Sequence, residues 1–408
     1  MTNRRVRVSA QPNLPAPVAS PYNGRMRSFD EVLTCVDRLA EAFAARADQH
    51  DREGSFAFEN VADLRAAGLP RLPVPATLGG DGFNLFQCVC VLQRLARADA
   101  STALGLAMHF HVVGSLAERC AWPEAAYARL CEEIVRDGAL VNSAASEPEM
   151  GSPSRGGLPA TRATRVAGGY RLNGRKSWVT YAPALRYFLV TATLEDAIGV
   201  FAVAGDSPGL TLIDNWGTSL SLRASGSFDV VLDDVFVPEC WHVEQRAPGQ
   251  ARRGGPPAGW ATCAFAAVYL GVGEGALYAL ARYAQQRVPT ALGKPIAELP
   301  HVQRGIGQMD VALRAARAVL YTAAQTWAEQ PARRAEMEAD LAAAKYLCTN
   351  AAIAATDTAL RIAGAGGLDR RLSLERHFRD ARAGLMHPPQ DDRALELIGK
   401  AVIAAIGA

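Results

Sequence analysis

The chain has 408 residues, of which 49% are hydrophobic and 21% are charged, a composition typical of globular proteins. This length predicts two or three packed units, and the formal net charge of +2 without a clustered basic face gives no reason to expect a nucleic-acid partner. No apolar run reaches the roughly 18 residues of a membrane-spanning helix without a polar break, so no membrane span is expected.

The cysteines do not indicate a metal site. Eight of them are scattered along the chain, and Cys88 with Cys90 forms a CxC pair that lacks a second pair at zinc-like spacing. Free thiols in a reducing compartment are the simplest interpretation, which favours a cytoplasmic location, and the absence of a hydrophobic N-terminal segment agrees with it. Residues 1–27 combine basic residues with a proline-rich run and are expected to form a disordered tail.

The first part of the chain after this tail, residues 28–138, is predicted to be an N-terminal α-helical domain. Apolar residues recur at helical spacing after Ser28, which forms a plausible capping box with Glu31. Further helices are expected over residues 60–68, about 85–98, and 101–120.

Two histidines lie on the helix predicted over residues 101–120. This helix is apolar almost all round, which indicates a buried element. Because His109 and His111 are two positions apart, their side chains point to roughly opposite faces and cannot both bind one metal ion. Each is explained as a satisfied core or surface histidine; the functional alternative is that one of them projects into a ligand pocket.

The pattern changes after Gly138. Short alternating apolar segments separated by Gly, Pro and Asn dominate residues 139–246 and predict a small antiparallel β-barrel. Residues 247–259 are rich in Pro and Gly and are expected to form a connecting loop. Long Ala-rich helical patterns then predict a four-helix bundle over residues 260–408, so the expected architecture is mainly α with a central β-barrel.

Two polar segments in the β-rich region indicate a ligand site. The segment Ser146–Ser152 (SEPEMGS) combines short hydroxyl side chains with Pro and Gly, and such a turn can present donors to an anion or to the polar edge of a ring. The segment Lys176–Thr180 (KSWVT) supplies an indole, Trp178, that is suited to covering a flat cofactor. The first segment alone would equally well be an ordinary surface turn, but the pair favours a cofactor site.

These segments resemble those of the acyl-CoA dehydrogenase superfamily. SEPEMGS is similar to that family's TEPxxGS turn, and KSWVT to its K-x-W-I/V-T strand. The resemblance extends from about residue 28 to residue 406. Other segments that resemble family motifs are LRAS (222–225), LDDVFVP (232–238), GKPI (293–296), RIAGAGGL (361–368) and the pair Arg379-Asp380.

The resemblance implies a flavoprotein, with FAD between the barrel and the bundle and a homotetramer in which a neighbouring subunit completes each flavin site. By that match Ser146 would hydrogen-bond the isoalloxazine, Trp178 and Thr180 would cover it, and Ser152 would lie near the pyrophosphate or a thioester carrier. A guanidinium suits a pyrophosphate, and glycine lets backbone approach closely. The residues that would reach the ADP half of an FAD bound mainly by a neighbour are Arg287, Leu292, Arg361 and Gly364.

The catalytic base that the family would lead us to expect is missing. Acyl-CoA dehydrogenases resembling this chain place a Glu shortly after the Arg-Asp pair, but residues 385–392 contain no Glu, and the alternative position around residues 260–262 has no carboxylate. Asp391 and Asp392 look like the first residues of a helix, and an exposed turn accounts for Glu147 and Glu149.

His387 resembles a residue of a different branch of the family. Residues 379–389 fit the frame R-D-x-R-x-x-x-x-H-[DP]-P of flavin monooxygenases such as dibenzothiophene monooxygenase. That branch also carries a His on the helix matched here by His109 or His111. Beside a reduced flavin an imidazole can give or take a proton, because its pKa lies near neutral. The alternative is that His387 only ends a helix, where a cation suits the helix dipole.

The sequence is therefore compatible with three functions. The preferred one is FAD-dependent α,β-dehydrogenation of an acyl thioester without the usual Glu, with electron-transfer flavoprotein as a candidate partner. The second is a monooxygenase that uses reduced FAD or FMN from a flavin reductase on an apolar substrate, with His387 as acid or base. The third is a non-catalytic subunit that binds flavin or acyl chains.

Overall fold

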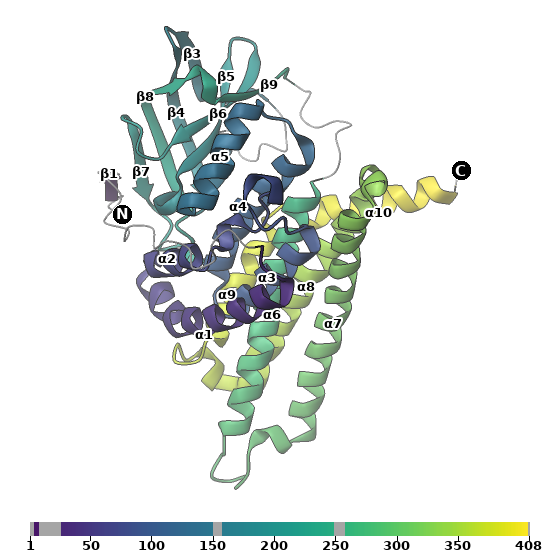
Figure 1. Cartoon of the computed structure of the whole chain (residues 1–408). Helices are drawn as coiled ribbons and strands as arrows, with labels where there is room; N and C mark the ends of the chain where they lie inside the picture. The colour runs from purple at the N-terminus through teal and green to yellow at the C-terminus, as the bar shows by residue number, and fades with distance from the viewer. Residues whose placement is uncertain (1–3, 8–25, 150–156, 249–257, 407–408) are drawn as a thin grey trace.

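The structure is a computed structural model that describes residues 4–7, 26–149, 157–248 and 258–406. Figure 1 shows a sheet at one end of the molecule, N-terminal helices below it, and long C-terminal helices that extend away from it. The chain therefore passes from helices to a sheet and back to helices, as the periodicity predicts.

The N-terminal helices begin at a capping box. The Ser28 hydroxyl accepts the Glu31 backbone N–H over 3.2 Å, and the Glu31 carboxylate accepts the Ser28 N–H over 2.8 Å, which confirms the predicted box. The helices of this part are α1 (Phe29–Glu53), α2 (Phe58–Ala66), α3 (Leu85–Ala96), α4 (Ala100–Arg119) and α5 (Glu124–Asp137).

The middle part is an open sheet rather than the predicted barrel. Its described strands are β1 (Arg4–Arg7), β2 (Val141–Ala144), β3 (Arg162–Val166), β4 (Gly169–Val179), β5 (Tyr187–Leu194), β6 (Ala197–Ala204), β7 (Leu210–Asp214), β8 (Phe228–Pro238) and β9 (His242–Arg246). They follow the order β1-β7-β8-β4-β3-β5-β6-β9, with β2 paired to β5, and β1 and β9 do not pair with each other. Strand β5 pairs in parallel with both β2 and β3, so the sheet is not wholly antiparallel either.

Strand β1 corrects the expectation of a disordered tail for four of its residues. Residues 4–7 pair antiparallel with β7, from Arg4 opposite Asp214 to Arg7 opposite Thr211. Without this pairing β7 would be an edge strand with a row of unsatisfied backbone groups, which gives the extended segment a place to bind. Residues 1–3 and 8–25 of the predicted tail, and residues 249–257 of the predicted loop, lie outside the described residues.

The C-terminal part is the predicted bundle with one additional helix. Its helices are α6 (Gly259–Gln286), α7 (Pro300–Glu329), α8 (Glu338–Ala363), α9 (Leu374–Ala381) and α10 (Asp391–Ile406). Small residues allow these helices to approach closely: a Cβ atom at Gly271 of α6 would lie 2.5 Å from the Gln93 carbonyl oxygen of α3. The short, charged helix α9 is the one that the sequence analysis did not predict.

Two helices, α4 and α6, are long and apolar enough to cross a membrane by length and composition alone. In the structure, 83% of the apolar window of α4 and 89% of that of α6 are buried inside the protein. Leu106 and Phe110 of α4 belong to the core that the N-terminal and C-terminal helices share, while Val113 and Leu116 pack into the core under the sheet. Both helices are therefore core helices, and α4 joins the two cores.

Candidate functional site

The two polar segments singled out in the sequence lie against each other. The Ser177 N–H, near the end of β4, donates to the carbonyl oxygen of Ser146 over 2.9 Å. The Lys176 ammonium donates to Glu147 Oε1 over 2.6 Å. The turn after β2 and the end of β4 therefore form one unit, in which Ser146 is half-buried. Ser152 lies outside the described residues.

Glu147 is a buried anchor of this unit, which corrects the expectation of an exposed turn residue. The side chains of Lys176 and Glu147 are 0% and 1% exposed. Glu147 also accepts hydrogen bonds from the Thr161 backbone N–H over 3.0 Å and from the Thr161 hydroxyl over 2.6 Å. Burial acts to raise the pKa of Glu147, but the hydrogen bonds from Lys176 and Thr161 outweigh it and lower the pKa. The carboxylate therefore stays ionised and holds the ammonium.

The end of β4 leaves a large aromatic ring uncovered. Trp178 is 55% exposed and has φ 59°, in the bulge where the register of β4 with β8 shifts. A positive φ is uncommon for a residue with a large side chain, and bulges often aim side chains at ligands. Thr180 is buried; its hydroxyl shares a hydrogen bond of 2.9 Å with the Ser227 hydroxyl, and its carbonyl accepts from the Asn142 side chain. The surroundings thus fix the backbone that presents the indole.

The four residues predicted to reach a neighbour's ADP lie at the other end of the molecule. Arg287 ends α6, Leu292 lies in the connection to α7, and both Arg361 and Gly364 lie at the end of α8. A Cβ atom at Gly366 would lie 2.6 Å from the Tyr283 hydroxyl, so the ends of α6 and α8 are neighbours. Figure 1 places the connection between α6 and α7 far from the sheet. One chain therefore does not bring this group to Trp178.

Arg361 and Gly364 have the exposure that contact with another molecule requires. The Arg361 side chain is 77% exposed and pairs with Asp357 Oδ2 over 2.6 Å, one turn earlier on α8. Gly364 has φ 61°, and a Cβ atom there would meet nothing within 4 Å. Arg287 is also exposed, and Leu292 is half-buried. Their predicted role toward a neighbouring subunit stays a prediction.

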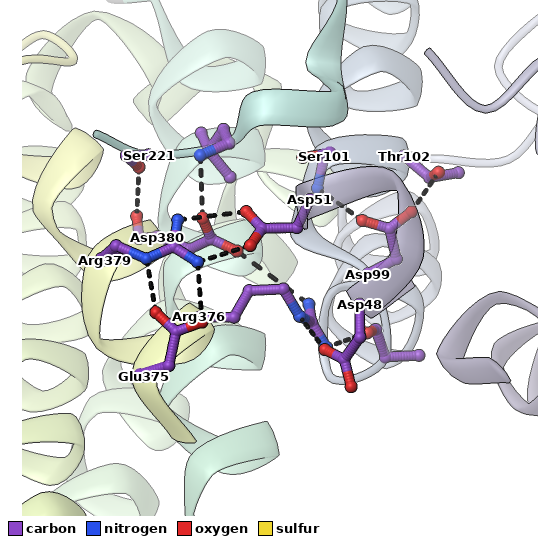
Figure 2. A network of polar contacts seen from close by, with 12 residues as sticks. Asp48, Asp51, Asp99, Ser101, Thr102, Ser221, Glu375, Arg376, Arg379 and Asp380 are labelled. Atoms are coloured by element: carbon purple, nitrogen blue, oxygen red, sulfur yellow. Dashed lines mark hydrogen bonds and ion pairs between the residues drawn. The ribbon is translucent and has the colours of Figure 1, made fainter. Parts of the chain in front are cut away.

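The Arg-Asp pair on α9 joins the three parts of the chain (Figure 2). Asp380 Oδ1 accepts the Leu222 N–H over 2.8 Å, and the Asp380 carbonyl accepts the Ser221 hydroxyl over 3.1 Å. Arg379 pairs with Asp51 of α1 over 2.5 Å. Burial raises the pKa of Asp380 to about 7. These contacts give the pair a structural role, since they connect α9 to α1 and to the LRAS segment.

The structure accounts for His109 as a core residue. It is 0% exposed; its Nδ1 accepts the Val141 N–H over 3.2 Å, and its Nε2 lies 2.9 Å from the Pro70 carbonyl oxygen. Because both ring nitrogens bond to backbone groups, Nε2 carries the hydrogen and neither nitrogen is available to a ligand. Burial lowers the pKa of His109 to about 4, so the ring is neutral. His111 is half-buried.

His387, which the sequence analysis offers as a catalytic residue, lies against α6. Its ring stacks on Phe265, with centroids 4.3 Å apart and an interplanar angle of 15°. Its Nδ1 lies 2.5 Å from the Tyr269 hydroxyl oxygen, and Nε2 has no hydrogen-bond partner among the described residues. Burial, together with the nearby positive charge of Lys345, lowers the pKa of this half-buried imidazole to about 4. The neutral imidazole is therefore held through Nδ1, while Nε2 has no partner among the described residues.

The sequence did not identify three side chains around His387. Phe265 and Tyr269 are four residues apart on α6, so they share a face, and a hydroxyl within an apolar helix was the available signal. Lys345 of α8 is 0% exposed and donates to the Gly384 carbonyl over 2.7 Å, and burial lowers its pKa to about 8. Asp391 and Asp392 lie in the first turn of α10, as expected.

No group of three or more His, Cys, Asp or Glu side chains that could hold a metal ion occurs in the described part of the chain.

Comparison with known proteins gives a consistent family assignment along the chain. The model of the acyl-CoA dehydrogenase N-terminal domain matches residues 30–144, that of the middle domain matches residues 142–235, and that of the C-terminal domain matches residues 260–402.

Curated relatives cover nearly the whole chain. It is 40% identical over 362 residues to the "Putative acyl-CoA dehydrogenase YdbM" of Bacillus subtilis (strain 168), a match that covers 88% of this chain and 93% of that protein. It is 30% identical to dibenzothiophene monooxygenase of Rhodococcus erythropolis, covering 86% and 88%. It is also 30% identical to the amino sugar nitrososynthase DnmZ of Streptomyces peucetius, covering 88% and 89%.

Solved structures share the fold. Butyryl-CoA dehydrogenase from Megasphaera elsdenii superposes with a TM-score of 0.80 at 23% identity, covering 92% of this chain and 98% of that one. TdsC from Paenibacillus sp. A11-2, in complex with FMN and indole, superposes with a TM-score of 0.82 at 24% identity, covering 92% and 97%.

Proposed function

The chain belongs to the acyl-CoA dehydrogenase family, and we propose that within this family it is a flavin-dependent monooxygenase that uses reduced flavin and dioxygen on an apolar substrate. It is a flavin-dependent oxidoreductase like its relatives, some of which are dehydrogenases and some oxygenases. The observation that carries the choice between these reactions is His387, which lies within residues 385–392, the segment where the dehydrogenases would carry a Glu and this chain has none.

The residues of the site fit a flavin. Trp178 presents a 55% exposed indole on a backbone that is held by the bulge of β4, and a flat ring system would cover that surface. The hydrogen bond between Ser177 and Ser146 holds Ser146 at the same end of β4, and its hydroxyl would bond the edge of the flavin ring. Thr180, two residues after Trp178, is buried and would lie beneath the flavin. FAD is the flavin of the family, and the related oxygenase TdsC was solved with FMN.

The surroundings of His387 support a role as a hydrogen-bond donor. Phe265 stacks on this ring, the Tyr269 hydroxyl lies within hydrogen-bond distance of it, and the Lys345 charge acts on it; none of these three groups is a carboxylate. Because its pKa is lowered to about 4, the imidazole is neutral at pH 7 and presents a single ring nitrogen, Nε2, to a ligand.

Reduced flavin supplies the electrons that activate dioxygen, so that one oxygen atom enters the substrate and the other leaves as water. The departing oxygen gains negative charge, which a donor at Nε2 of His387 would stabilise. Phe265 keeps the imidazole in one plane, and Tyr269 holds its other nitrogen. A neighbouring subunit would complete the flavin site through Arg287, Leu292, Arg361 and Gly364, with a flavin reductase as the source of reduced flavin.

Dehydrogenation of an acyl thioester is the second candidate. The 40% identity to YdbM, whose name places it among acyl-CoA dehydrogenases, favours it. Nε2 of His387 would then have to accept the α-proton, and a neutral imidazole with a pKa of about 4 is about as basic as an ordinary Glu. Electron-transfer flavoprotein would be the acceptor in that case.

Anaerobic mixing with acyl-CoAs separates the two candidates. We expect the visible absorbance of the flavin-loaded protein to remain unchanged with saturated acyl-CoAs of short, medium and long chains, because residues 385–392 carry no Glu and His387 acts in this proposal as a donor. Dithionite serves as the control that the flavin can be reduced. Rapid bleaching by any acyl-CoA would establish the dehydrogenase and refute the monooxygenase.

A further inference from the structure

Tyr269 forms the direct hydrogen bond to His387, and no motif in the sequence singled it out. It lies in the middle of α6, 0% exposed, with its hydroxyl oxygen 2.5 Å from Nδ1 of His387. One turn earlier on the same face, Phe265 stacks on the imidazole. These two side chains hold the ring by one nitrogen and by one face, which leaves the opposite nitrogen open.

We infer that Tyr269 is a positioning residue that fixes the tautomer of His387: its hydroxyl donates to Nδ1, so that Nε2 carries the hydrogen and presents it to the ligand. The inference rests on the proposed role of His387 as a donor and adds the residue that makes it one. A histidine with the hydrogen on Nδ1 would instead present a lone pair, which suits a proton acceptor.

In the bond between Tyr269 and His387, the Tyr269 hydroxyl is the donor and Nδ1 is the acceptor. The phenol has one hydrogen, and the described residues offer it no acceptor other than Nδ1 of His387. If Nδ1 carried a hydrogen too, two hydrogens would compete for one 2.5 Å contact and the buried phenol hydrogen would stay unsatisfied. Burial raises the pKa of Tyr269 well above its usual value, so the phenol keeps its hydrogen.

Lys345 supports the same arrangement from α8. Its ammonium donates to the Gly384 carbonyl over 2.7 Å and so ties down the segment that carries His387. Its charge also disfavours a second proton on the imidazole, which keeps Nδ1 available as an acceptor. Asp391, 3.9 Å from Lys345, is the acidic group nearest to this ammonium.

Histidine NMR tests the inference without any substrate. Long-range ¹H–¹⁵N spectra of the flavin-loaded protein labelled with [¹⁵N]histidine distinguish a protonated from an unprotonated ring nitrogen, and the signals lost in His387→Gln assign His387. We expect wild-type His387 to carry its hydrogen on Nε2 alone. In Tyr269→Phe, which removes only the hydroxyl, we expect a mixture of both tautomers.

Two controls separate this effect from a general disturbance. His109 is held in the Nε2–H tautomer by Val141 and Pro70, so its signals should not change in Tyr269→Phe. Tyr278→Phe makes the same substitution on the exposed face of α6 and should leave both histidines as in the wild type.

Turnover gives the second readout. In the proposed oxygenation, Tyr269→Phe should lower kcat about 10-fold while KM and the affinity for flavin stay within a factor of about two. A wild-type His387 with its hydrogen on Nδ1, or a Tyr269→Phe protein in which the tautomer is unchanged, would overturn the inference. If the tautomer result holds but no substrate is oxygenated, the proposed function fails and the positioning role of Tyr269 stands.

Discussion

Buried histidines make the stability of this protein depend on pH in a definite direction. Burial lowers the pKa of His109 to about 4, while an unfolded histidine has a pKa of about 6.5. Between these values the unfolded chain binds a proton that the folded chain does not, so the free energy of unfolding falls as the pH falls. The difference corresponds to about 3 kcal/mol by pH 4 for His109 alone. His377 and His387 act in the same direction.

His109→Gln removes this titrating group. At pH 7 this variant should lose about 2–4 kcal/mol, because it disturbs the bonds to Val141 and Pro70. Its unfolding free energy should then vary less between pH 7 and pH 4.5 than that of the wild type. Urea denaturation at several pH values measures both effects, and a slope equal to that of the wild type would show that His109 is not the titrating group.

The surroundings of Glu147, Tyr269 and Lys345 could not be predicted from the sequence. The motif that contains Glu147 predicted a turn near Trp178, and the turn is there. Its burial could not be read from the sequence, since a Glu between Ser and Pro is usually exposed and its partner Lys176 lies 29 residues away. Tyr269 and Lys345 were missed for the same reason, because their partners are set by how α6 and α8 pack.

The unit formed by the turn after β2 and the end of β4 depends on one buried ion pair. Lys176→Met would leave the Glu147 carboxylate buried without its countercharge, and we expect a loss of about 3–5 kcal/mol in unfolding free energy. Flavin affinity should fall as well, since Ser146 is held next to this pair. Urea denaturation and flavin fluorescence measure the two effects.

Lys294→Met provides the matched control. Lys294 pairs with Glu298 over 3.5 Å, and both side chains are about half exposed, so its loss should cost less than about 1 kcal/mol. The double variant Lys176→Met/Glu147→Gln should recover part of the stability, because no unpaired charge remains buried. If Lys176→Met cost no more than the control, the ion pair would not anchor the unit.

Helices in which apolar residues recur at helical spacing could be predicted from the sequence, whereas helices without that pattern could not. The long helices α1, α4, α6 and α7 follow their apolar patterns closely. Helix α9 has only eight residues, five of them charged or His, so it lacks such a pattern. Whether the sheet closes into a barrel depends on which edge strands pair with each other. Strand β1 pairs with β7, some two hundred residues later, and such a long-range pairing cannot be read from the local alternation of apolar residues.

On the scale of the chain, the Arg-Asp pair has a structural role, whereas the unit formed by the turn after β2 and the end of β4 is the proposed flavin site. Arg379 and Asp380 hold α9 against α1 and the LRAS segment, so a motif that marks the family here serves to join its parts (Figure 2). The connection between α6 and α7, which contains Leu292, lies at the far end of the bundle from the sheet (Figure 1). The separation within one chain is what a site completed by a second subunit requires.

Oxygen transfer to the substrate tests the central claim most directly. The flavin-loaded protein, fed with NADH and a flavin reductase under ¹⁸O₂, is incubated with the apolar aromatic probes indole and dibenzothiophene, and the products are analysed by mass spectrometry. We predict a product that carries one ¹⁸O atom, formed about 100-fold more slowly by His387→Gln at unchanged flavin occupancy. Products without ¹⁸O, or labelled products formed equally fast by His387→Gln, would contradict the proposed role of His387.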